Sequence, residues 1–416
     1  MSIGTIAWNL RRDELLLVLD SPRRVPPVPR IFHFLRFLCL PCQLRFTKTF
    51  LMITPRQFLR ALAALSAGIL SGLVSLTAFA GPPAGVLDDT HANVRAVMAA
   101  QHEVTANWMR QPEILGTAVG LDGAGNLSLL VYVDQDASNA GAVIRNLPRD
   151  VHGVGVQVEL TDKFRSMAQP SAGTSHTAIQ TPPIQLGTSG GWRFDLANGF
   201  CCGGTLGSLV SIAGVQHILS NYHVFESDIV PGGNSRVAMT GDPVIQPGLI
   251  DVNCNAANAQ DVALLVKRSS LPASNVDCAI AAVIPGQVRT DGAILEIGTI
   301  SSQTVAASIN QPVKKSGRTT GLTRSKVSGL NATISVQYDN ECAGGVAFTK
   351  TFTGQIVITN RGSRFLNSGD SGSLMVEDIT TNPRAVGLLF AGSSSTAIAN
   401  PIGEVLTFLG ATMVGN

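Results

Sequence analysis

The sequence is poor in aromatic and in charged residues, which make up 5% and 14% of its 416 positions. Its apolar share of 45% excludes a disordered chain, because disordered chains contain too few apolar side chains to form a core. Glycine, with 42 residues, and proline, with 21, are by contrast common. Few aromatics together with many turn formers favour numerous short strands over long helices.

The main part of the chain also lacks an excess of positive charge. The first 80 residues contain 10 Lys and Arg and 3 Asp and Glu, which gives +7, and residues 81–416 contain 20 and 25, which gives −5. A mildly acidic body gives no electrostatic reason to expect nucleic acid as a partner, and we predict no such partner.

Residues 52–80 have the three regions of a secretory signal peptide. Arg56 and Arg60 precede an apolar run, and an Ala-Phe-Ala pattern ends at Ala80, the predicted cleavage site. The alternative is a transmembrane anchor, but glycines and serines interrupt a run shorter than the roughly 20 residues of a membrane span. We predict a secreted or periplasmic protein with no stable membrane span after signal removal, and we interpret residues 1–51 as a non-native upstream extension.

Seven cysteines occur, and their spacing does not match a zinc site. Two of them lie in the upstream extension. An odd number remains, whose pairing cannot be deduced from sequence: Cys201, Cys202, Cys254, Cys278 and Cys342. We expect neither a metal ion nor another cofactor.

The pattern of apolar residues divides the rest of the chain into three parts. Residues 81–165 combine helical and alternating strand patterns, which predict a small α+β domain. Residues 166–190 are rich in Pro, Ser, Thr and Gly without periodicity, which predicts a linker. Residues 191–416 contain short strand-like runs between turn residues and end in a helical pattern, "PIGEVLTFLG", which predicts an all-β domain with a closing helix.

The stretch "NSGDSGSLMV" places Ser371 between an aspartate and a glycine. A serine hydroxyl attacks a carbonyl only when a base accepts its proton and a third group orients that base. Glycines on both sides allow a sharp turn, in which the N–H groups of Gly369 and Ser371 are able to converge on a developing oxyanion. The same letters also form an ordinary turn, so this motif alone leaves both interpretations open.

Two further stretches, "LSNYHVF" with His223 and "SNVDCAIAAV" with Asp277, complete the chain order His, Asp, Ser. Together with "CGGTLGSLV", "GDSGS" and "KKSGRTTGL", they resemble the chymotrypsin-like (trypsin-fold) serine proteases, and among these the secreted bacterial branch typified by α-lytic protease and the streptogrisins. The resemblance covers residues 191–416. It implies two six-stranded antiparallel β-barrels with a C-terminal helix. It also implies that Ser371 is the nucleophile, His223 the general base, Asp277 the group that orients the imidazole, and Gly369 and Ser371 the oxyanion donors.

Three features depart from the family pattern. Val224 directly follows the histidine, where the family usually has a disulfide-bonded cysteine, so Cys202 lacks that partner. Lys314 and Arg324 stand where the bacterial branch has a disulfide pair around "SGRTTG". No sequence of the Arg-Ile-Val-Gly-Gly kind precedes the barrel domain, so Asp370 is not expected to depend on a newly cut N-terminus, as its counterpart does in trypsin-type zymogens.

The resemblance also places the substrate pocket. Its base lies at Phe365, six residues before the nucleophile. Its wall is formed by Phe390, Ala391 and Gly392. Because residues 360–368 contain no carboxylate, a bound Lys or Arg side chain would lack a counter-charge. We expect cleavage after small or apolar residues, and an acidic preference through Arg361 and Arg364 is the alternative.

A second aspartate competes for the triad role. Asp261 in "AQDVALLV" has the local form of the aspartate motif in mammalian relatives, but it lies 38 residues after His223 and 110 before Ser371. Asp277 lies 54 residues after the histidine and 94 before the serine, which fits the family spacing better. We predict that Asp277 completes the triad.

These patterns predict a secreted serine endopeptidase that acts on proteins or peptides. An esterase or a processing enzyme of narrow specificity would use the same triad, and a catalytically inactive trypsin-fold binding protein would retain it without using it. Residues 81–165 are predicted to be a pro-domain or accessory domain within the same chain, since bacterial relatives often carry a folding or inhibitory segment there.

Overall fold

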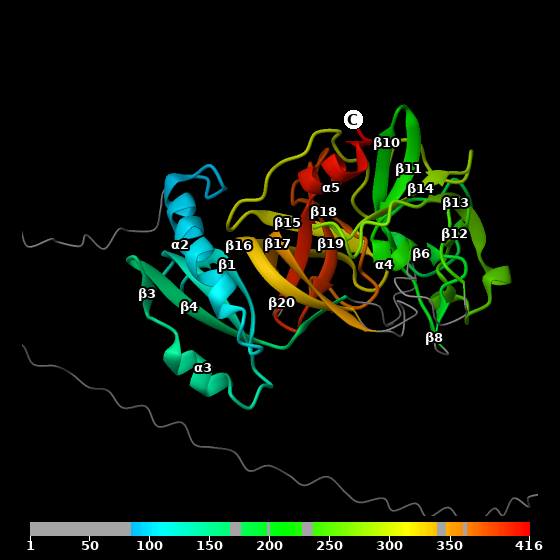
Figure 1. Cartoon of the computed structure of the whole chain (residues 1–416). Coiled ribbons are helices and arrows are strands. Elements are labelled where there is room, and N and C mark those ends of the chain that lie inside the picture. The colour runs from blue at the N-terminus through cyan, green and yellow to red at the C-terminus, as the bar shows by residue number, and fades with distance from the viewer. Residues whose placement is uncertain (1–84, 167–175, 198–199, 227–235, 339–346, 361–363) are drawn as a thin grey trace, which may run out of the picture. The chain divides into compact units, whose positions relative to one another are not determined.

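The computed structural model describes residues 85–166, 176–197, 200–226, 236–338, 347–360 and 364–416 (Figure 1). The predicted upstream extension, the predicted signal peptide, Cys342 and Arg361 lie outside these residues. Two large β-sheets and a small two-stranded one contain all the named strands of this described part. Within it, every helix is too short or too polar to cross a membrane.

The first large sheet contains eight strands in the order β21-β10-β11-β14-β13-β12-β6-β9. These strands are β6 (Thr188–Trp192), β9 (Gly204–Leu206), β10 (Ser208–Ile212), β11 (Val215–Ser220), β12 (Pro243–Gln246), β13 (Gln260–Val266), β14 (Ala279–Val283) and β21 (Thr412–Met413). Ala213 and Gly214, with φ of 48° and 81°, form the two-residue turn between β10 and β11. Positive φ at both positions matches the right-handed twist of a hairpin.

Shorter elements accompany this sheet in the sequence: the hairpin β7 (Leu196–Ala197) and β8 (Phe200–Cys201), the helix α4 (Tyr222–Phe225), and the 3-10 turns η1 (Leu249–Asp251) and η2 (Ala256–Asn258). A disulfide joins Cys201 to Cys254. Cys202 is also disulfide-bonded, whereas Cys278 is a free and buried thiol.

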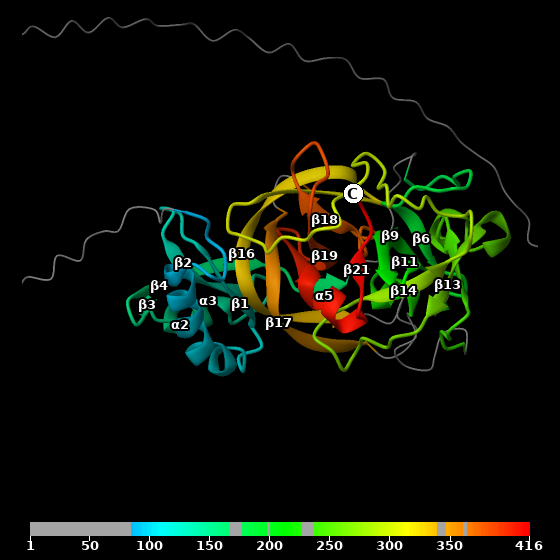
Figure 2. The same ribbon diagram turned by 90° about the horizontal axis from the view of Figure 1, so that it is seen from above.

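The second sheet includes a closed barrel of six strands, in the order β15-β18-β19-β20-β17-β16, because β15 also pairs with β16. These strands are β15 (Pro312–Gly317), β16 (Gly321–Tyr338), β17 (Phe348–Thr359), β18 (Leu374–Glu377), β19 (Ala385–Gly392) and β20 (Thr396–Pro401). The helix α5 (Ile402–Leu409) packs on β19 and β20 and ends at Gly410, whose φ is 64° (Figure 2). The predicted all-β fold with two barrel-like sheets and a C-terminal helix is confirmed.

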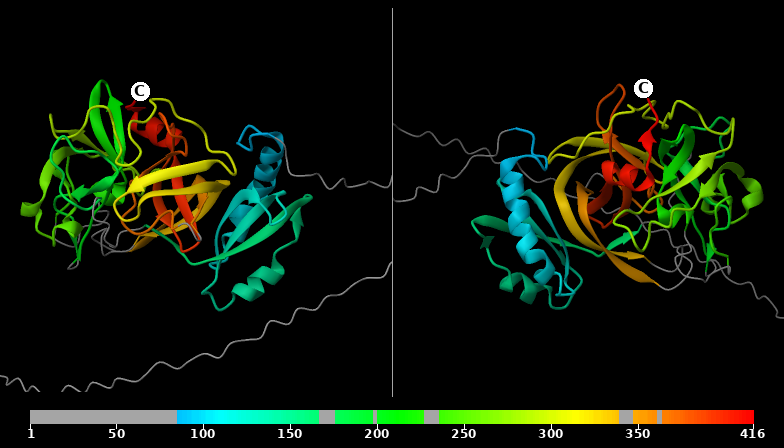
Figure 3. Two further views of the ribbon diagram at one scale, coloured as in Figure 1. Left: turned by 180° about the vertical axis from the view of Figure 1, so that it is seen from behind. Right: turned by 45° about the horizontal axis from the view of Figure 1, so that its top comes forward.

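A small α+β unit precedes the barrels. Its elements are α2 (Ala92–Trp108), β1 (Ile114–Leu121), β2 (Leu127–Asp134), α3 (Ala140–Asn146), β3 (Asp150–Val151) and β4 (Val154–Thr161). The strand β1 pairs with β2 on one side and with β16 on the other, so the sheet of this unit continues the sheet of the second barrel (Figure 3). Gly116 permits this approach, because a Cβ there would lie 2.5 Å from the carbonyl oxygen of Thr333.

Two segments connect this unit to the first barrel. The strand β5 (Phe164–Ser166) runs parallel to β16 and antiparallel to β19. In the described part of the predicted linker, Ile184 and Leu186 are fully buried and form single bridges with Val288 and Ile294. Single buried positions of this kind give no helical or strand period, which is why the sequence pattern indicated only a linker here.

Candidate active site

The first sheet brings His223 and Asp277 together. The helix α4, which carries His223, follows β11, and Asp277 lies two residues before β14, whose Ala279 pairs with Ser220 at the end of β11. The Nδ1 atom of His223 lies 2.7 Å from Oδ2 of Asp277, and both residues are buried. Since a carboxylate only accepts hydrogen bonds, this contact places the imidazole proton on Nδ1.

Further groups fix the aspartate. The backbone N–H of Tyr222 donates to Oδ1 of Asp277 at 2.7 Å, and the hydroxyl of Tyr338 donates to Oδ2 at 2.8 Å. The Asp277 backbone is held on both sides, because its N–H donates to the Asn400 side chain at 2.9 Å and its carbonyl accepts from Asn221 Nδ2 at 2.7 Å. Every one of these contacts restricts the direction of the carboxylate.

Asp261, the other candidate for the triad, lies elsewhere. Its side chain is 41% exposed and forms an ion pair with Arg193. No hydrogen bond joins it to His223, whose described carboxylate partner is Asp277.

Ser371 lies on the turn that leads into β18 of the second barrel, and strand β9 of the first sheet holds this turn. The N–H of Thr205 donates to the Ser371 carbonyl oxygen at 2.8 Å, and the Thr205 hydroxyl donates to the Gly369 carbonyl oxygen at 2.9 Å. A Cβ at Gly204 would lie 2.6 Å from Val224 and 2.9 Å from the Ser371 carbonyl oxygen. The small size of Gly204 therefore lets the histidine helix and the serine turn approach each other.

No hydrogen bond joins Ser371 to His223 in the structure. Ser371 Oγ lies 3.5 Å from the carbonyl oxygen of Phe390, and the buried Nε2 atom of His223 has no hydrogen-bond partner among the described residues. With the proton on Nδ1, this Nε2 atom carries a lone pair and acts as an acceptor. The structure thus contains an unused buried base beside the turn of the serine.

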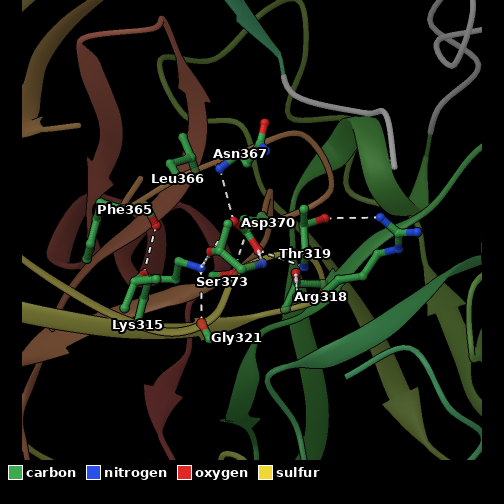
Figure 4. Close-up of polar contacts among 12 residues, drawn as sticks. Lys315, Arg318, Thr319, Gly321, Phe365, Leu366, Asn367, Asp370 and Ser373 are labelled. Atoms are coloured by element: carbon green, nitrogen blue, oxygen red, sulfur yellow. Dashed lines mark hydrogen bonds and ion pairs between the residues drawn. The ribbon is translucent and has the colours of Figure 1, made fainter. Parts of the chain in front are cut away.

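A dense polar network holds Asp370, the residue before Ser371 (Figure 4). Five donors reach its carboxylate: Lys315 Nζ at 3.1 Å, the N–H of Thr319 at 2.9 Å, the N–H of Thr320 at 3.1 Å, the Thr320 hydroxyl at 2.7 Å and the N–H of Asn367 at 3.0 Å. Both side chains of the ion pair between Lys315 and Asp370 are fully buried. Asp370 is therefore neutralised by an ammonium group from within the chain.

The lysine is saturated as well. Besides Asp370, its ammonium group donates to the Thr320 hydroxyl and, at 3.2 Å, to the Gly321 carbonyl oxygen, so all three N–H bonds have acceptors. Burial lowers the pKa of Lys315, and the charge of Asp370 opposes this effect.

The "SGRTTG" turn packs directly on the serine turn. Arg318 binds Asp251 through two hydrogen bonds of 2.6 Å, and its side chain is almost fully buried. A Cβ at Gly369 would lie 2.5 Å from the Thr319 hydroxyl and 2.7 Å from Arg318 Nη1, and the φ of Gly369 is 91°. Only glycine fits both the space and the backbone conformation at this predicted oxyanion position.

The predicted pocket residues lie in two buried apolar clusters, Phe365 in one and Phe390 and Ala391 in the other. Phe365, Phe390 and Ala391 are fully buried, and the rings of Phe352 and Phe390 are tilted with their centroids 4.9 Å apart. The amide of Asn360 joins the segment of the predicted base to that of the predicted wall, because it bonds the backbone of Leu366 and the carbonyl oxygen of Ser393. Residues 364–368, the described part of the base, carry no carboxylate.

The positions that depart from the family pattern have other partners. Lys314 and Arg324 face each other across β15 and β16. The Lys314 ammonium donates to the Ile379 carbonyl oxygen at 2.7 Å, and Arg324 pairs with Asp378 at 3.1 Å. Polar contacts therefore stand in place of the disulfide.

Sequence reasoning missed Tyr338, Asn400 and the role of Lys315. Lys315 lies in the quoted stretch "KKSGRTTGL", so its position next to the motif was a usable signal. Tyr338 and Asn400 are 61 and 123 residues from Asp277 in the sequence, and no local pattern marks them. In the described part of the chain, no group of three or more His, Cys, Asp or Glu side chains is placed to hold a metal ion.

The family model of the Nal1 C-terminal domain matches residues 270–400, a stretch that contains Asp277 and Ser371 but not His223. No curated protein gives a significant match. Among solved structures, the chain is similar to a glutamic acid-specific serine protease described as using a histidine triad in substrate binding, with 18% identity, a TM-score of 0.37, and coverage of 55% of this chain and 100% of that one. It is also similar to protease A of Thermobifida fusca, with 17% identity, a TM-score of 0.35, and coverage of 51% and 92%. A Nocardiopsis protease has 15% identity, a TM-score of 0.34, and coverage of 50% and 91%.

Proposed function

We propose that the chain is a serine endopeptidase, in which Ser371, His223 and Asp277 hydrolyse peptide bonds through an acyl-enzyme. The observation that carries this proposal is the buried contact of 2.7 Å between His223 and Asp277, which leaves Nε2 as a buried acceptor without a partner among the described residues. A buried polar atom without a partner is costly, so a functional reason for it is expected. The proton of an attacking serine supplies that reason.

The proposed reaction follows from these positions. Ser371 Oγ attacks the substrate carbonyl carbon while His223 Nε2 takes the hydroxyl proton, and Asp277 stabilises the resulting imidazolium. The N–H groups of Gly369 and Ser371 donate to the oxyanion. The imidazolium then gives its proton to the leaving amine as the C–N bond breaks. Water then attacks the acyl-enzyme and gives a proton to His223 Nε2. The return of this proton to Ser371 Oγ, as the ester bond breaks, releases the acid.

We propose small or apolar residues before the scissile bond as the substrate class. The predicted pocket base, at the buried Phe365, has no carboxylate in residues 364–368, so a buried Lys or Arg side chain would remain unpaired at a high cost. A peptide library in which cleavage after Lys or Arg dominates would exclude this specificity. Dominant cleavage after Asp or Glu would support the alternative that involves Arg364.

We propose that the N-terminal unit acts as an intramolecular pro-domain or accessory domain through β5. Strand β18 pairs with β19 up to Leu388, and beyond that point β5 pairs with Ala391 and Gly392 of β19. The last residue of β5, Ser166, pairs with Ala391, and the carbonyl oxygen of the preceding Phe390 lies 3.5 Å from Ser371 Oγ. A peptide substrate added as a strand at this edge would need the edge that β5 occupies, so β5 and the substrate compete.

The deciding experiment is labelling with a fluorophosphonate probe, which reacts only with an activated serine. The probe is expected to label the full chain and not the Ser371→Ala variant. Folded protein that is not labelled would support the inactive binding protein instead. Labelling combined with hydrolysis of esters, but of no peptide in a library, would support the esterase. N-terminal analysis of the exported protein would test the proposed secretion and the cleavage after Ala80.

A further inference from the structure

Tyr338 is the last residue of β16, and its hydroxyl donates to Oδ2 of Asp277 at 2.8 Å. The same oxygen atom accepts the bond from His223 at 2.7 Å. We infer that Tyr338 is a fourth member of the candidate active site, a positioning residue that acts on His223 through Asp277. This inference rests on the proposed function, since it assigns a role in the same reaction.

Packing fixes the direction of the Tyr338 hydroxyl. The side chain is 1% exposed, and its ring stacks on Phe348 with centroids 4.7 Å apart and an interplanar angle of 9°. The ring of His223 meets it edge to face at 6.0 Å. A ring held on two sides cannot swing its hydroxyl away, so the bond to Asp277 is part of the fold.

The Tyr338 hydroxyl has only one protonation state in this position. Burial raises the pKa of Tyr338 well above 10, and the charge and hydrogen bond of Asp277 raise it further. The phenol therefore keeps its proton throughout the range in which an imidazole titrates, and it acts only as a donor toward the carboxylate.

Two effects on His223 follow. First, the bond fixes the rotation of the carboxylate, because Oδ1 is held by the Tyr222 N–H and Oδ2 by Tyr338. Second, a donor on Oδ2 withdraws part of the negative charge that stabilises the imidazolium. Removal of the Tyr338 hydroxyl should therefore strengthen the stabilisation of the imidazolium by Asp277, and a more acidic phenol should weaken it.

Among the described residues, four other titratable groups lie near this cluster. They are Glu226 at the end of α4, Cys278 directly before β14, Lys350 near the Phe352 ring, and Arg165 on β5, which pairs with Gln337. Burial raises the pKa of Cys278 and of Glu226. Neither forms a hydrogen bond with the imidazole, so changes at Tyr338 should reach His223 through Asp277 alone.

The test compares Tyr338→Phe with Tyr132→Phe, a control that removes a buried hydroxyl from the N-terminal unit. Tyr338→Phe is expected to lower kcat about tenfold with little change in KM, as expected for loss of a hydrogen bond to a charged group. The acid limb of kcat/KM should move to higher pH. If Tyr338→Phe has the same kcat and the same acid limb of kcat/KM as Tyr132→Phe, the inference is wrong.

A second substitution covers the case in which Tyr338→Phe does not fold. 3-Fluorotyrosine placed at position 338 keeps the ring and hydroxyl but makes the phenol more acidic, so the acid limb should move to lower pH. An unchanged limb in this variant would also overturn the inference. The pKa of His223, measured by NMR in full-length protein, reports the same shift without turnover. Fluorophosphonate labelling of the unmodified chain tests the proposed function separately, so the two ideas can fail independently.

Discussion

The two halves of the candidate active site are each built around a buried aspartate, but they hold it differently. Asp277 is surrounded by neutral donors and by one imidazole. Asp370 is paired with the buried ammonium of Lys315 as well as with backbone N–H groups. Neutral donors can be removed one at a time at moderate cost, whereas removing one partner of a buried ion pair leaves an unpaired charge.

This difference indicates a division of tasks. The histidine half has a carboxylate whose basicity depends on several adjustable hydrogen bonds, which suits a group that must tune a proton transfer. The serine half is held by a buried ion pair next to Gly369, a position where any side chain would clash with Thr319 and Arg318. Changes in the first half should therefore alter rates, and changes in the second half should alter stability and rates together.

The largest effect is expected in the histidine half. Asp277→Asn should lower kcat by roughly 10⁴, because an amide allows the imidazole to adopt the wrong tautomer. The matched control, Asp261→Asn, breaks only the exposed pair with Arg193 and should keep most of the activity. The measurement is kcat for both variants at equal thermal stability. A larger loss for Asp261→Asn would transfer the role to that residue.

The serine half should respond first in stability. Lys315→Met leaves Asp370 buried without its counter-charge and should lower the free energy of unfolding by about 3–5 kcal/mol. Lys326→Met, at an exposed position on β16, should change it by less than about 0.5 kcal/mol. Urea unfolding of both variants measures the difference. Equal stability of the two variants would show that the buried pair does not hold this half of the site.

The sequence could predict those parts of the site that lie in contiguous motifs. Ser371 with its glycines, His223 and Asp277 each stand in a short stretch that limits the local backbone, and the all-β fold follows from the many short strand patterns. The ligands of Asp277 could not be predicted in this way. Tyr338 reaches Asp277 only because β16 runs for 18 residues and ends beside it, and that geometry depends on the register of the whole barrel.

The N-terminal unit shows the same limit. Its helix and strand patterns predicted a small α+β domain, but the pairing of β1 with β16 joins strands that are far apart in sequence. Strand β5 is three residues long and has no pattern of its own. Its position at the edge of β19 is set by two tertiary partners, so sequence alone assigned its last residue to a linker.

Strand β5 offers a smaller test, since it pairs with β16, which ends at Tyr338, and with β19, whose Phe390 carbonyl oxygen lies beside Ser371. Proline at Arg165 and, in a separate variant, at Ser166 removes one backbone N–H each. Because neighbouring residues of a strand donate toward opposite sides, one of the two variants must weaken the pairing with β19. That variant should have a KM about fivefold lower at similar kcat, as an intramolecular competitor is lost. Arg165→Ala keeps the N–H and serves as the control, and the same fall in KM there would assign the effect to the side chain.

The smallest expected effect concerns pH and separates the two halves directly. Because burial lowers the pKa of Lys315, its ammonium group loses its proton, as pH rises, before the ordinary value of 10.5 is reached, and the turn of Gly369 should loosen when that charge is lost. Burial raises the pKa values of Tyr338 and Cys278, so these two groups of the histidine half should keep their protons in the pH range in which Lys315 loses its proton. We expect an alkaline limb in kcat/KM that Lys315→Arg moves to higher pH, since a guanidinium keeps its charge.

The free energy of unfolding should not fall along this alkaline limb. A lowered lysine pKa means that the unfolded chain binds the proton more tightly, so the contribution of Lys315 to stability rises with pH between its folded value and 10.5. Activity and thermal unfolding measured across that window should thus move in opposite directions. A parallel fall of both in the native chain would mean that alkaline inactivation is unfolding, and that Lys315 does not control the serine turn.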